Sequence, residues 1–95
     1  MRYILERRAE VALRSLPHLE RQRFDRAIAS MLELSPQEIA SHGSVRLLGE
    51  SSQSRLYSYR SSATLRIIFS IGEDLLIVQD ILNRHRVRQI FGTSG

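Results

Sequence analysis

The spacing of apolar residues changes from a helical period to a strand period near Gly43. Apolar positions three and four residues apart predict a first amphipathic helix that ends near Pro17, with a buried side made of Ala9, Ala12, Leu13 and Leu16. The same spacing predicts a second helix, closed by Ser35-Pro36, with a buried side made of Phe24, Ala27, Ile28 and Met31. Ser35 to Glu38 has the sequence of a capping box, which predicts a further short helical turn.

From Val45 onward, apolar residues alternate with polar ones, as in strands that have one covered face. The alternation predicts four strands, at Val45–Leu48, Arg55–Arg60, Leu65–Ile71 and Leu75–Leu82. The last is almost continuously apolar, which is typical of a central strand covered on both faces. Short turns at 61–63 and 72–74 make neighbouring strands antiparallel, and residues 3–5 could add one further strand.

Together these elements predict an α+β fold in one domain that spans residues 1–95. We expect the two helices to form an antiparallel hairpin on one face of a small antiparallel sheet, because their apolar stripes need a surface to cover. The chain then closes with a basic segment that is predicted to be a short helix. This segment has Val87, Ile90 and Phe91 on one side and Gly92 as its terminator.

The charge of the chain favours an anionic partner. The net charge is +4, and all 14 basic residues are arginine, whose planar fork of donors suits phosphate and carboxylate groups. Residues 1–42 carry seven arginines and six acidic residues, whereas residues 43–95 carry seven and four. Most of the positive surplus therefore lies in the second half, and we expect this half to contact an anionic partner.

Several other kinds of site are not expected. The chain has no cysteine, which excludes disulfides, thiolate catalysis and cysteine-ligated zinc. Its three histidines, His18, His42 and His85, lie far apart, so no metal and no other cofactor is predicted. No apolar run approaches the roughly 18 residues of a membrane span. The opening MRYILERRAE lacks the apolar stretch of a secretory signal, so we expect a cytoplasmic protein without membrane contact.

Arginines of the second half are the first candidates for function. The strand neighbours of Arg66 on the other face are large and apolar, so Arg66 projects from the open face, either towards an anion or paired with an acid. Arg84, His85, Arg86 and Arg88 form either a positive patch or a solvated helix end. Cationic neighbours would lower the pKa of His85 and favour the neutral imidazole of a general base, although a lone histidine is often structural.

Other polar residues of the strand at 55–60 leave two interpretations open. Tyr57 and Tyr59 could stack on nucleic-acid bases, or they could pack as residues of a half-buried strand. Ser58 belongs to no identifiable Ser-His-Asp arrangement, and the five glycines are too scattered to form a phosphate-cradling loop.

The stretch RLYSYRSSATLRIIFSIGEDLLIVQDILNRHRVRQIF resembles the C-terminal half of RelE/ParE superfamily toxins. Such toxins have a strand of the type L-Y-R-I-R, then one of the type Y-R-V-I-Y. An apolar strand follows, and then a histidine/arginine cluster with an aromatic residue after it. The corresponding pieces here are Leu56–Arg60, Leu65–Phe69, Leu75–Leu82 and Arg84–Phe91. The helical first half matches more loosely, so the resemblance covers essentially the whole chain.

This resemblance implies the toxin of a type II toxin–antitoxin system. In the RelE branch it implies an enzyme, an endoribonuclease that cleaves mRNA in the ribosomal A site and inhibits translation. The expected chemistry is attack of a ribose 2′-OH on the adjacent phosphate. By position, Arg66 and Arg60 would stabilise that phosphate, with His85 as general base or acid and Arg86 beside it.

Further residues are expected to contact the nucleic acid, namely Arg84, Arg88, Ser58 and Tyr57. A cognate antitoxin would hold the toxin inactive. It is expected to present an acidic segment to the same surface, because buried arginines need partners.

Two departures from the family pattern keep alternatives open. Phe91 stands where many ribonuclease members carry a catalytic tyrosine, and Ser58 stands where relatives often have a basic residue. Arginine cannot replace a proton-transferring group, because its pKa exceeds about 12. One alternative is therefore a ParE-like inhibitor of DNA gyrase without nuclease activity. The other is an inactive member that binds its antitoxin and co-represses its own operon.

Overall fold

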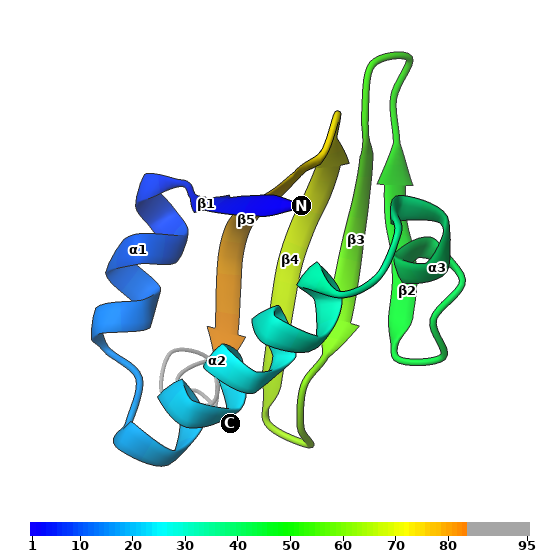
Figure 1. The fold of residues 1–95 in the computed structure, drawn as a ribbon. Coiled ribbons are helices and arrows are strands. Elements are labelled where there is room, and N and C mark those ends of the chain that lie inside the picture. Colours follow the sequence, from blue (N-terminus) through cyan, green and yellow to red (C-terminus); the bar gives the residue numbers. More distant parts are fainter. Residues whose placement is uncertain (84–95) are drawn as a thin grey trace, which may run out of the picture.

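Five strands form a single sheet in the computed structural model, which describes residues 1–83 (Figure 1). The order of strands across the sheet is β1-β5-β4-β3-β2. In chain order the elements are β1 (Arg2–Leu5), α1 (Arg7–Arg14), α2 (His18–Leu32), α3 (Pro36–Ala40), β2 (Val45–Glu50), β3 (Arg55–Arg60), β4 (Leu65–Gly72) and β5 (Leu75–Asn83). The α+β class and the four strands of the second half are as predicted.

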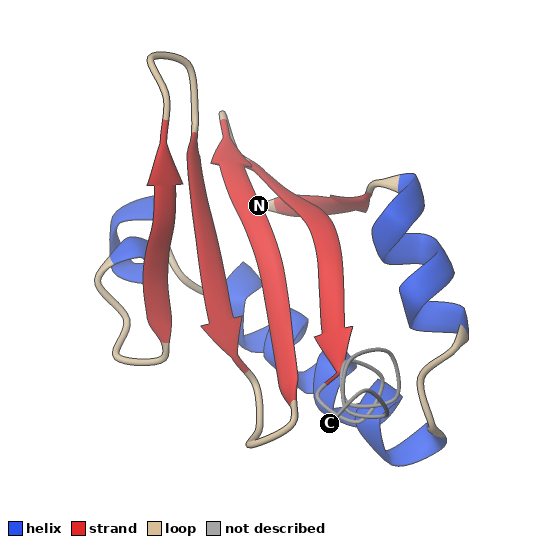
Figure 2. Cartoon of the chain, turned by 180° about the vertical axis from the view of Figure 1, so that it is seen from behind, coloured by secondary structure: helices blue, strands red, loops and turns tan. Residues whose placement is uncertain are grey.

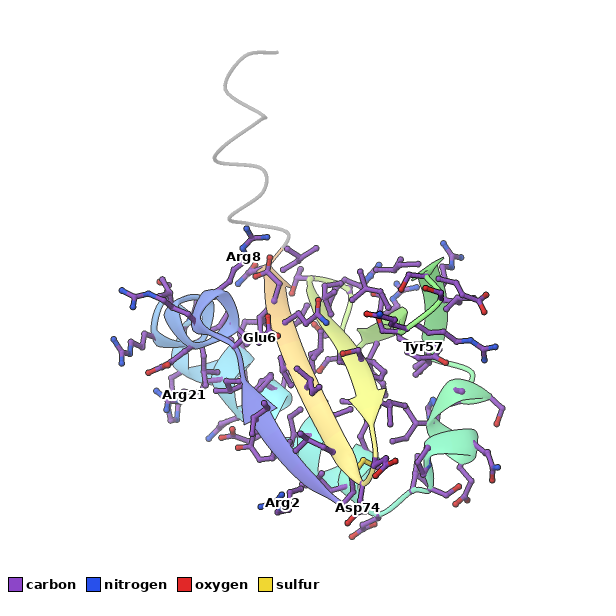
Figure 3. All side chains as sticks on the ribbon, turned by 90° about the horizontal axis from the view of Figure 1, so that it is seen from above. Arg2, Glu6, Arg8, Arg21, Tyr57 and Asp74 are labelled. Atoms are coloured by element: carbon purple, nitrogen blue, oxygen red, sulfur yellow. The ribbon has the colours of Figure 1, made fainter. Side chains whose placement is uncertain are left out.

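The sheet is mixed, which corrects the prediction of a wholly antiparallel one. Strands β2 to β5 pair antiparallel in sequence order, whereas β1 pairs parallel with β5. A tight turn at Asp74, which has a φ of 52°, forces β4 and β5 to run in opposite directions. The long connection between β1 and β5 imposes no such direction. The main-chain N–H of Arg2 donates to the carbonyl oxygen of Asp74 at 3.2 Å, which fastens β1 to that turn (Figure 3).

The helices lie on one side of the sheet, over different strands (Figure 1). Helix α1 packs beside β5 and β1, helix α2 crosses the sheet over β4, and α3 lies next to β2. The predicted antiparallel packing of α1 against α2 is therefore not confirmed. Their predicted apolar residues do turn inward, because Ala9, Ala12, Phe24 and Met31 are all nearly inaccessible to solvent.

The hydrophobic core fills the space between the helices and the sheet. Leu65, Ile67 and Phe69 of β4 alternate towards the helices and are fully buried. Ile39 of α3 completes this core near β2. The capping box at Ser35 is confirmed, because its hydroxyl accepts a hydrogen bond from the main-chain N–H of Glu38 and its own N–H donates to the Glu38 carboxylate.

No described helix covers the opposite side of the sheet, which faces the viewer in Figure 2 and is called the open face below. Leu82 of β5 is 39% exposed there. Strand β5 lies inside the sheet, between β1 and β4, but within residues 1–83 it is not covered on both faces as predicted. The predicted C-terminal helix lies outside the described residues. None of the helices in 1–83 is long and apolar enough to cross a membrane.

Candidate anion-binding site

Three arginines come together on the open face, one from each of three neighbouring strands. Arg46 of β2 lies opposite Ser58 of β3, and Arg60 of β3 lies opposite Arg66 of β4. Directly opposite residues of an antiparallel pair project to the same face of the sheet. The alternation that sends Leu65 and Ile67 into the core therefore sends Arg66 and its partner Arg60 outward.

These arginines line a hollow of about 440 Å³, which we call the arginine pocket. Its other walls come from the loop before β2 and from apolar side chains of the open face. The full lining is Gly43, Ser44, Val45, Arg46, Leu48, Ser58, Arg60, Arg66, Ile68 and Leu82. A pocket that combines fixed cations with an apolar floor suits a ligand that carries both an anionic group and a flat or apolar one.

The positive charge of the arginine pocket is not neutralised by the described part of the chain. The ion pairs of residues 1–83 join Met1 to Asp74, Arg14 to Glu10, Arg23 to Glu20 and Arg55 to Glu50. None involves an arginine of the pocket. Arg60 and Arg66 are directly opposite each other, an arrangement of like charges that destabilises a sheet unless an anion lies between them. The pocket is therefore a candidate site for phosphate or carboxylate.

Arg66 is oriented by a main-chain group instead of an acid. Its Nη1 donates to the carbonyl oxygen of Ser62, in the turn between β3 and β4, at 3.2 Å. Asp80 lies opposite Ile68 on the open face, but its carboxylate accepts a hydrogen bond from the main-chain N–H of Ile81 at 2.8 Å. Among the described residues, Arg66 thus keeps its charge available for a ligand.

The predicted site residues separate into three groups. Ser58, Arg60 and Arg66 are brought together in the arginine pocket. Tyr57 lies on the other side of the sheet, towards α3 (Figure 3), is 8% exposed and stacks on Phe69 with 5.5 Å between ring centroids. The packing interpretation of Tyr57 is the one that this geometry supports. Finally, His85 and the arginines Arg84, Arg86 and Arg88 lie outside the described residues.

Arg46 is the pocket residue that the sequence analysis missed. It is exposed on β2 and directly precedes the two exposed leucines Leu47 and Leu48. The signal was available, because applying strand alternation from Val45 onward places Arg46 on the face opposite a half-buried apolar residue.

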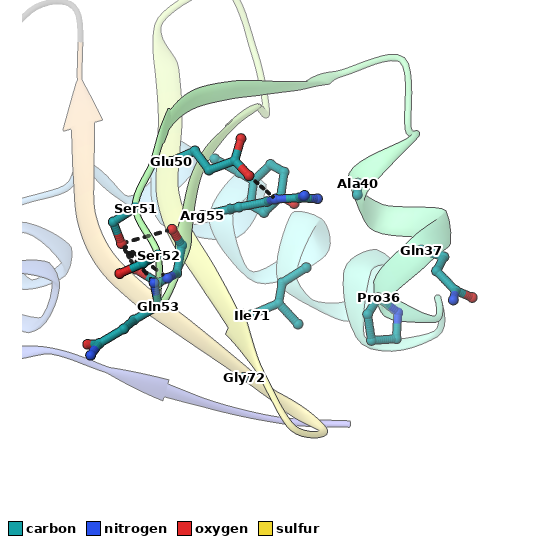
Figure 4. Close-up of a pocket in the computed structure, with 12 residues that line it drawn as sticks. Pro36, Gln37, Ala40, Glu50, Ser51, Ser52, Gln53, Arg55, Ile71 and Gly72 are labelled. Carbon is teal, nitrogen blue, oxygen red and sulfur yellow. Dashed lines mark hydrogen bonds and ion pairs between the residues drawn. The ribbon is translucent and has the colours of Figure 1, made fainter.

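A second hollow, of about 500 Å³, lies between α3 and the loop that joins β2 to β3 (Figure 4). Its only cation among the lining residues, Arg55, contacts the Glu50 carboxylate at 3.1 Å. A hydrogen bond with the Tyr57 side chain, followed by the contact with Glu50, raises the pKa of Arg55. Because this cation is already paired, the hollow is the weaker candidate for an anion. In the described part of the chain, no three histidine or acidic side chains gather as a metal site.

No protein-family model and no curated protein matches the sequence. Solved structures do match the fold. A chain of the archaeal RelE–RelB complex from Pyrococcus horikoshii has a TM-score of 0.67 at 24% identity, over 90% of this chain and 96% of that one. The chain has the RelE fold.

Two further matches support the RelE fold. The isolated RelE toxin of E. coli matches with a TM-score of 0.62 at 18% identity, over 94% of this chain and 97% of that one. A chain of the RelB–RelE antitoxin–toxin complex from Methanococcus jannaschii matches with a TM-score of 0.60 at 15% identity, over 93% of this chain and 98% of that one. Each match covers at least nine-tenths of this chain and of the solved chain, so the likeness concerns the whole RelE fold and not one part of it.

Proposed function

We propose that this chain is the toxin of a type II toxin–antitoxin system and that it cleaves mRNA on the ribosome. The observation that carries the proposal is the arginine pocket, in which Arg46, Arg60 and Arg66 lack acidic partners among the described residues of a RelE fold. Unpaired cations over an apolar floor suit a polynucleotide, which offers phosphates and bases together.

The proposed reaction is attack of a ribose 2′-OH on the adjacent phosphate, in mRNA bound at the ribosomal A site. A bond forms between the 2′ oxygen and phosphorus and the bond to the 5′ oxygen breaks, which leaves a cyclic phosphate and a 5′-OH. The two non-bridging oxygens gain negative charge in the transition state. We assign the stabilisation of this charge to Arg60 and Arg66, and the support for this is that they lie opposite each other on β3 and β4.

Proton transfer needs a different side chain. The 2′-OH must lose a proton and the leaving 5′ oxygen must gain one. Arginine cannot do either, because its pKa lies above about 12. We assign one of these two transfers to His85, as general base or acid, with the other proton exchanged with water. Arg86 lies beside it in the sequence, and Arg84 and Arg88 are assigned as contacts to the nucleic acid. These four residues follow β5 directly in the sequence, and Leu82 of β5 lines the arginine pocket.

The second partner is a cognate antitoxin with an acidic segment. Matched solved structures include complexes of RelE with RelB. An acidic segment would neutralise the arginine pocket and compete with RNA for it, so antitoxin and RNA binding should both weaken at high salt.

The test uses purified chain added to ribosomes programmed with a defined mRNA, with cleavage read by primer extension. Wild-type protein should give discrete cuts that require ribosomes. Arg66→Ala and His85→Ala should each abolish the cuts while their circular dichroism spectra stay those of wild type. Arg55→Ala is the matched control, because Arg55 also lies on β3 but outside the arginine pocket.

Two outcomes would contradict the proposal. Unchanged cleavage by both the Arg66 and His85 variants would overturn the assignment of catalytic residues. If induction in growing cells arrested DNA synthesis and left the messages uncut, the nuclease assignment would be wrong and gyrase inhibition would take its place. Loss of growth with rapid arrest of protein synthesis is the expected result.

A further inference from the structure

A buried carboxylate lies beneath the turn that precedes Arg66. Glu20, in the first turn of α2, is only 7% exposed. Both of its carboxylate oxygens are engaged: Oε1 forms an ion pair with Arg23, and Oε2 accepts a hydrogen bond from the Thr64 hydroxyl at 3.3 Å. A charge withdrawn from water in this way needs such partners. Glu20 therefore joins α2 to the turn between β3 and β4.

That turn, at residues 61–64, is held in shape by its own hydrogen bonds. The main-chain N–H groups of Ser61 and Ser62 both donate to the carbonyl oxygen of Leu65. The N–H of Thr64 donates to the Ser62 hydroxyl at 3.3 Å. A second tie to α2 runs from the Ser61 hydroxyl to the carbonyl oxygen of Arg23 at 3.3 Å. Ser62 is thus held through its main-chain N–H, which donates to Leu65, and through its hydroxyl, which accepts from Thr64.

The carbonyl oxygen of Ser62 is the acceptor that orients Arg66. A continuous chain of contacts leads from Glu20 through Thr64 and Ser62 to the guanidinium of Arg66. An arginine on an open strand face has several freely rotating bonds, and a fixed acceptor removes much of that freedom before a ligand arrives. The helix side of the sheet can thereby influence a cation on the open face.

We propose that Glu20 is a positioning residue for Arg66, acting through Thr64 and the carbonyl group of Ser62. The inference rests on the proposed function, because it takes Arg66 to be a ligand of the RNA phosphate. The competing explanation is that Glu20 only fastens the turn to α2 and so contributes to folding. The two explanations differ in whether the hydroxyl of Thr64 changes RNA binding in a fully folded protein.

The experiment compares Thr64→Val with Thr64→Ser. Valine keeps the volume of the side chain but removes the hydroxyl that reaches Glu20, whereas serine restores it. Affinity is measured for a short single-stranded RNA whose 2′ oxygens are methylated and cannot react, over a series of salt concentrations. Thr64→Val should weaken binding about threefold to tenfold, the size of a single hydrogen bond, and Thr64→Ser should bind like wild type.

The salt series separates positioning from loss of charge. Thr64→Val removes no arginine and so no positive charge, and the slope of log affinity against log salt should equal that of wild type. Arg66→Ala should lower both the affinity and the slope. Ser41→Ala removes a hydroxyl that, within residues 1–83, donates to carbonyl groups of α3, and this variant should change neither the affinity nor the slope.

A double variant tests whether Glu20 and Thr64 act through one contact. Glu20→Leu should cause the same loss as Thr64→Val, and the two together should lose no more than either alone. Equal binding by wild type, Thr64→Val and Thr64→Ser, with a clear loss in Arg66→Ala, would overturn the role of Glu20 and leave the proposed function intact. Unchanged binding by Arg66→Ala would overturn both.

Discussion

The two faces of the sheet are made by the same strands and have opposite characters. On the helix side, β4 contributes Leu65, Ile67 and Phe69, all fully buried. On the open face, the neighbouring position of the same strand is Arg66, directly opposite Arg60. One face concentrates apolar area removed from water, and the other concentrates charge without acidic partners among the described residues. Alternate residues of one strand thus contribute to the hydrophobic core and to the candidate anion-binding site.

This division explains how an unfavourable arrangement of charge persists in the fold. Two arginines opposite each other destabilise an antiparallel pair by about 0.2–1 kcal/mol. Burying one large apolar side chain contributes about 1.5–3 kcal/mol. The covered face therefore outweighs the repulsion on the open face several times over, and the repulsion remains available as a driving force for binding an anion.

The largest expected effect comes from removing a side chain of the covered face. Phe69→Ala should lower the free energy of unfolding by about 3–5 kcal/mol, because a fully buried ring that stacks on Tyr57 leaves a cavity. Urea denaturation measures the loss. Ile68→Ala is the matched control, because Ile68 directly precedes Phe69 and lies on the open face. It should lower the free energy of unfolding by less than half as much. Equal losses would break the comparison between the two faces.

Removing an arginine of the open face should have the opposite effects, with no loss of stability and a clear loss of RNA binding. Arg60→Ala should leave the free energy of unfolding unchanged or raise it by up to about 1 kcal/mol, because it relieves the repulsion with Arg66. The same variant should weaken binding of the methylated RNA about tenfold or more, since hydrogen bonds to charged groups are strong. Both quantities can be measured on one preparation. A loss of stability without a loss of affinity would mean that Arg60 stabilises the fold and does not bind RNA.

Arg46 offers a smaller and more specific test of how many strands form the site. Each phosphate contact on single-stranded nucleic acid contributes about −0.7 to the slope of log affinity against log salt. Contacts from all three arginines of the pocket would together contribute about −2 to this slope, in addition to any contribution from Arg84 and Arg88. Arg46→Ala should reduce its magnitude by about 0.7. An unchanged slope would confine the phosphate contacts to β3 and β4.

Local patterns in the sequence predicted the strands well. The boundaries of β3 were predicted at Arg55 and Arg60, where the structure has them, and those of β4 and β5 were predicted to within one residue. Alternation and turn residues act over a few positions, so a sequence displays them directly. The parallel pairing of β1 with β5 and the separate placement of α1 and α2 depend on contacts across the whole chain, which no local pattern specifies.

The candidate site was predictable to the extent that it follows from short-range geometry. A tight turn at 61–64 fixes the register of β3 against β4, and so places Arg60 opposite Arg66. The register of β2 is shifted by an irregularity between Leu47 and Gly49, within a hairpin whose loop is longer. Arg46 could therefore not be aligned with Ser58 from the sequence alone. The contact of Glu20 with Thr64 spans 44 positions, which puts it beyond any local pattern.

The smallest expected effect concerns Glu38, on the helix side of the comparison. Hydrogen bonds from the main chain and then the side chain of Ser35 lower the pKa of the Glu38 carboxyl below 4.5. A carboxyl whose pKa is lower in the folded state stabilises the fold above the pKa of the unfolded chain. This contribution is lost as the pH falls through the folded pKa.

Wild-type protein should therefore lose more stability than Glu38→Gln when the pH is lowered from 7 to 3, as measured by the midpoint of urea unfolding. Glutamine can still accept the hydrogen bond from Ser35 but does not titrate in this range. The other carboxylates contribute equally to both proteins, so the difference isolates the capping box. RNA affinity at pH 7 should be the same in the two proteins, because α3 contributes no residue to the arginine pocket. A change in RNA affinity would mean that α3, on the helix side, influences the open face, and the two faces would then not be independent.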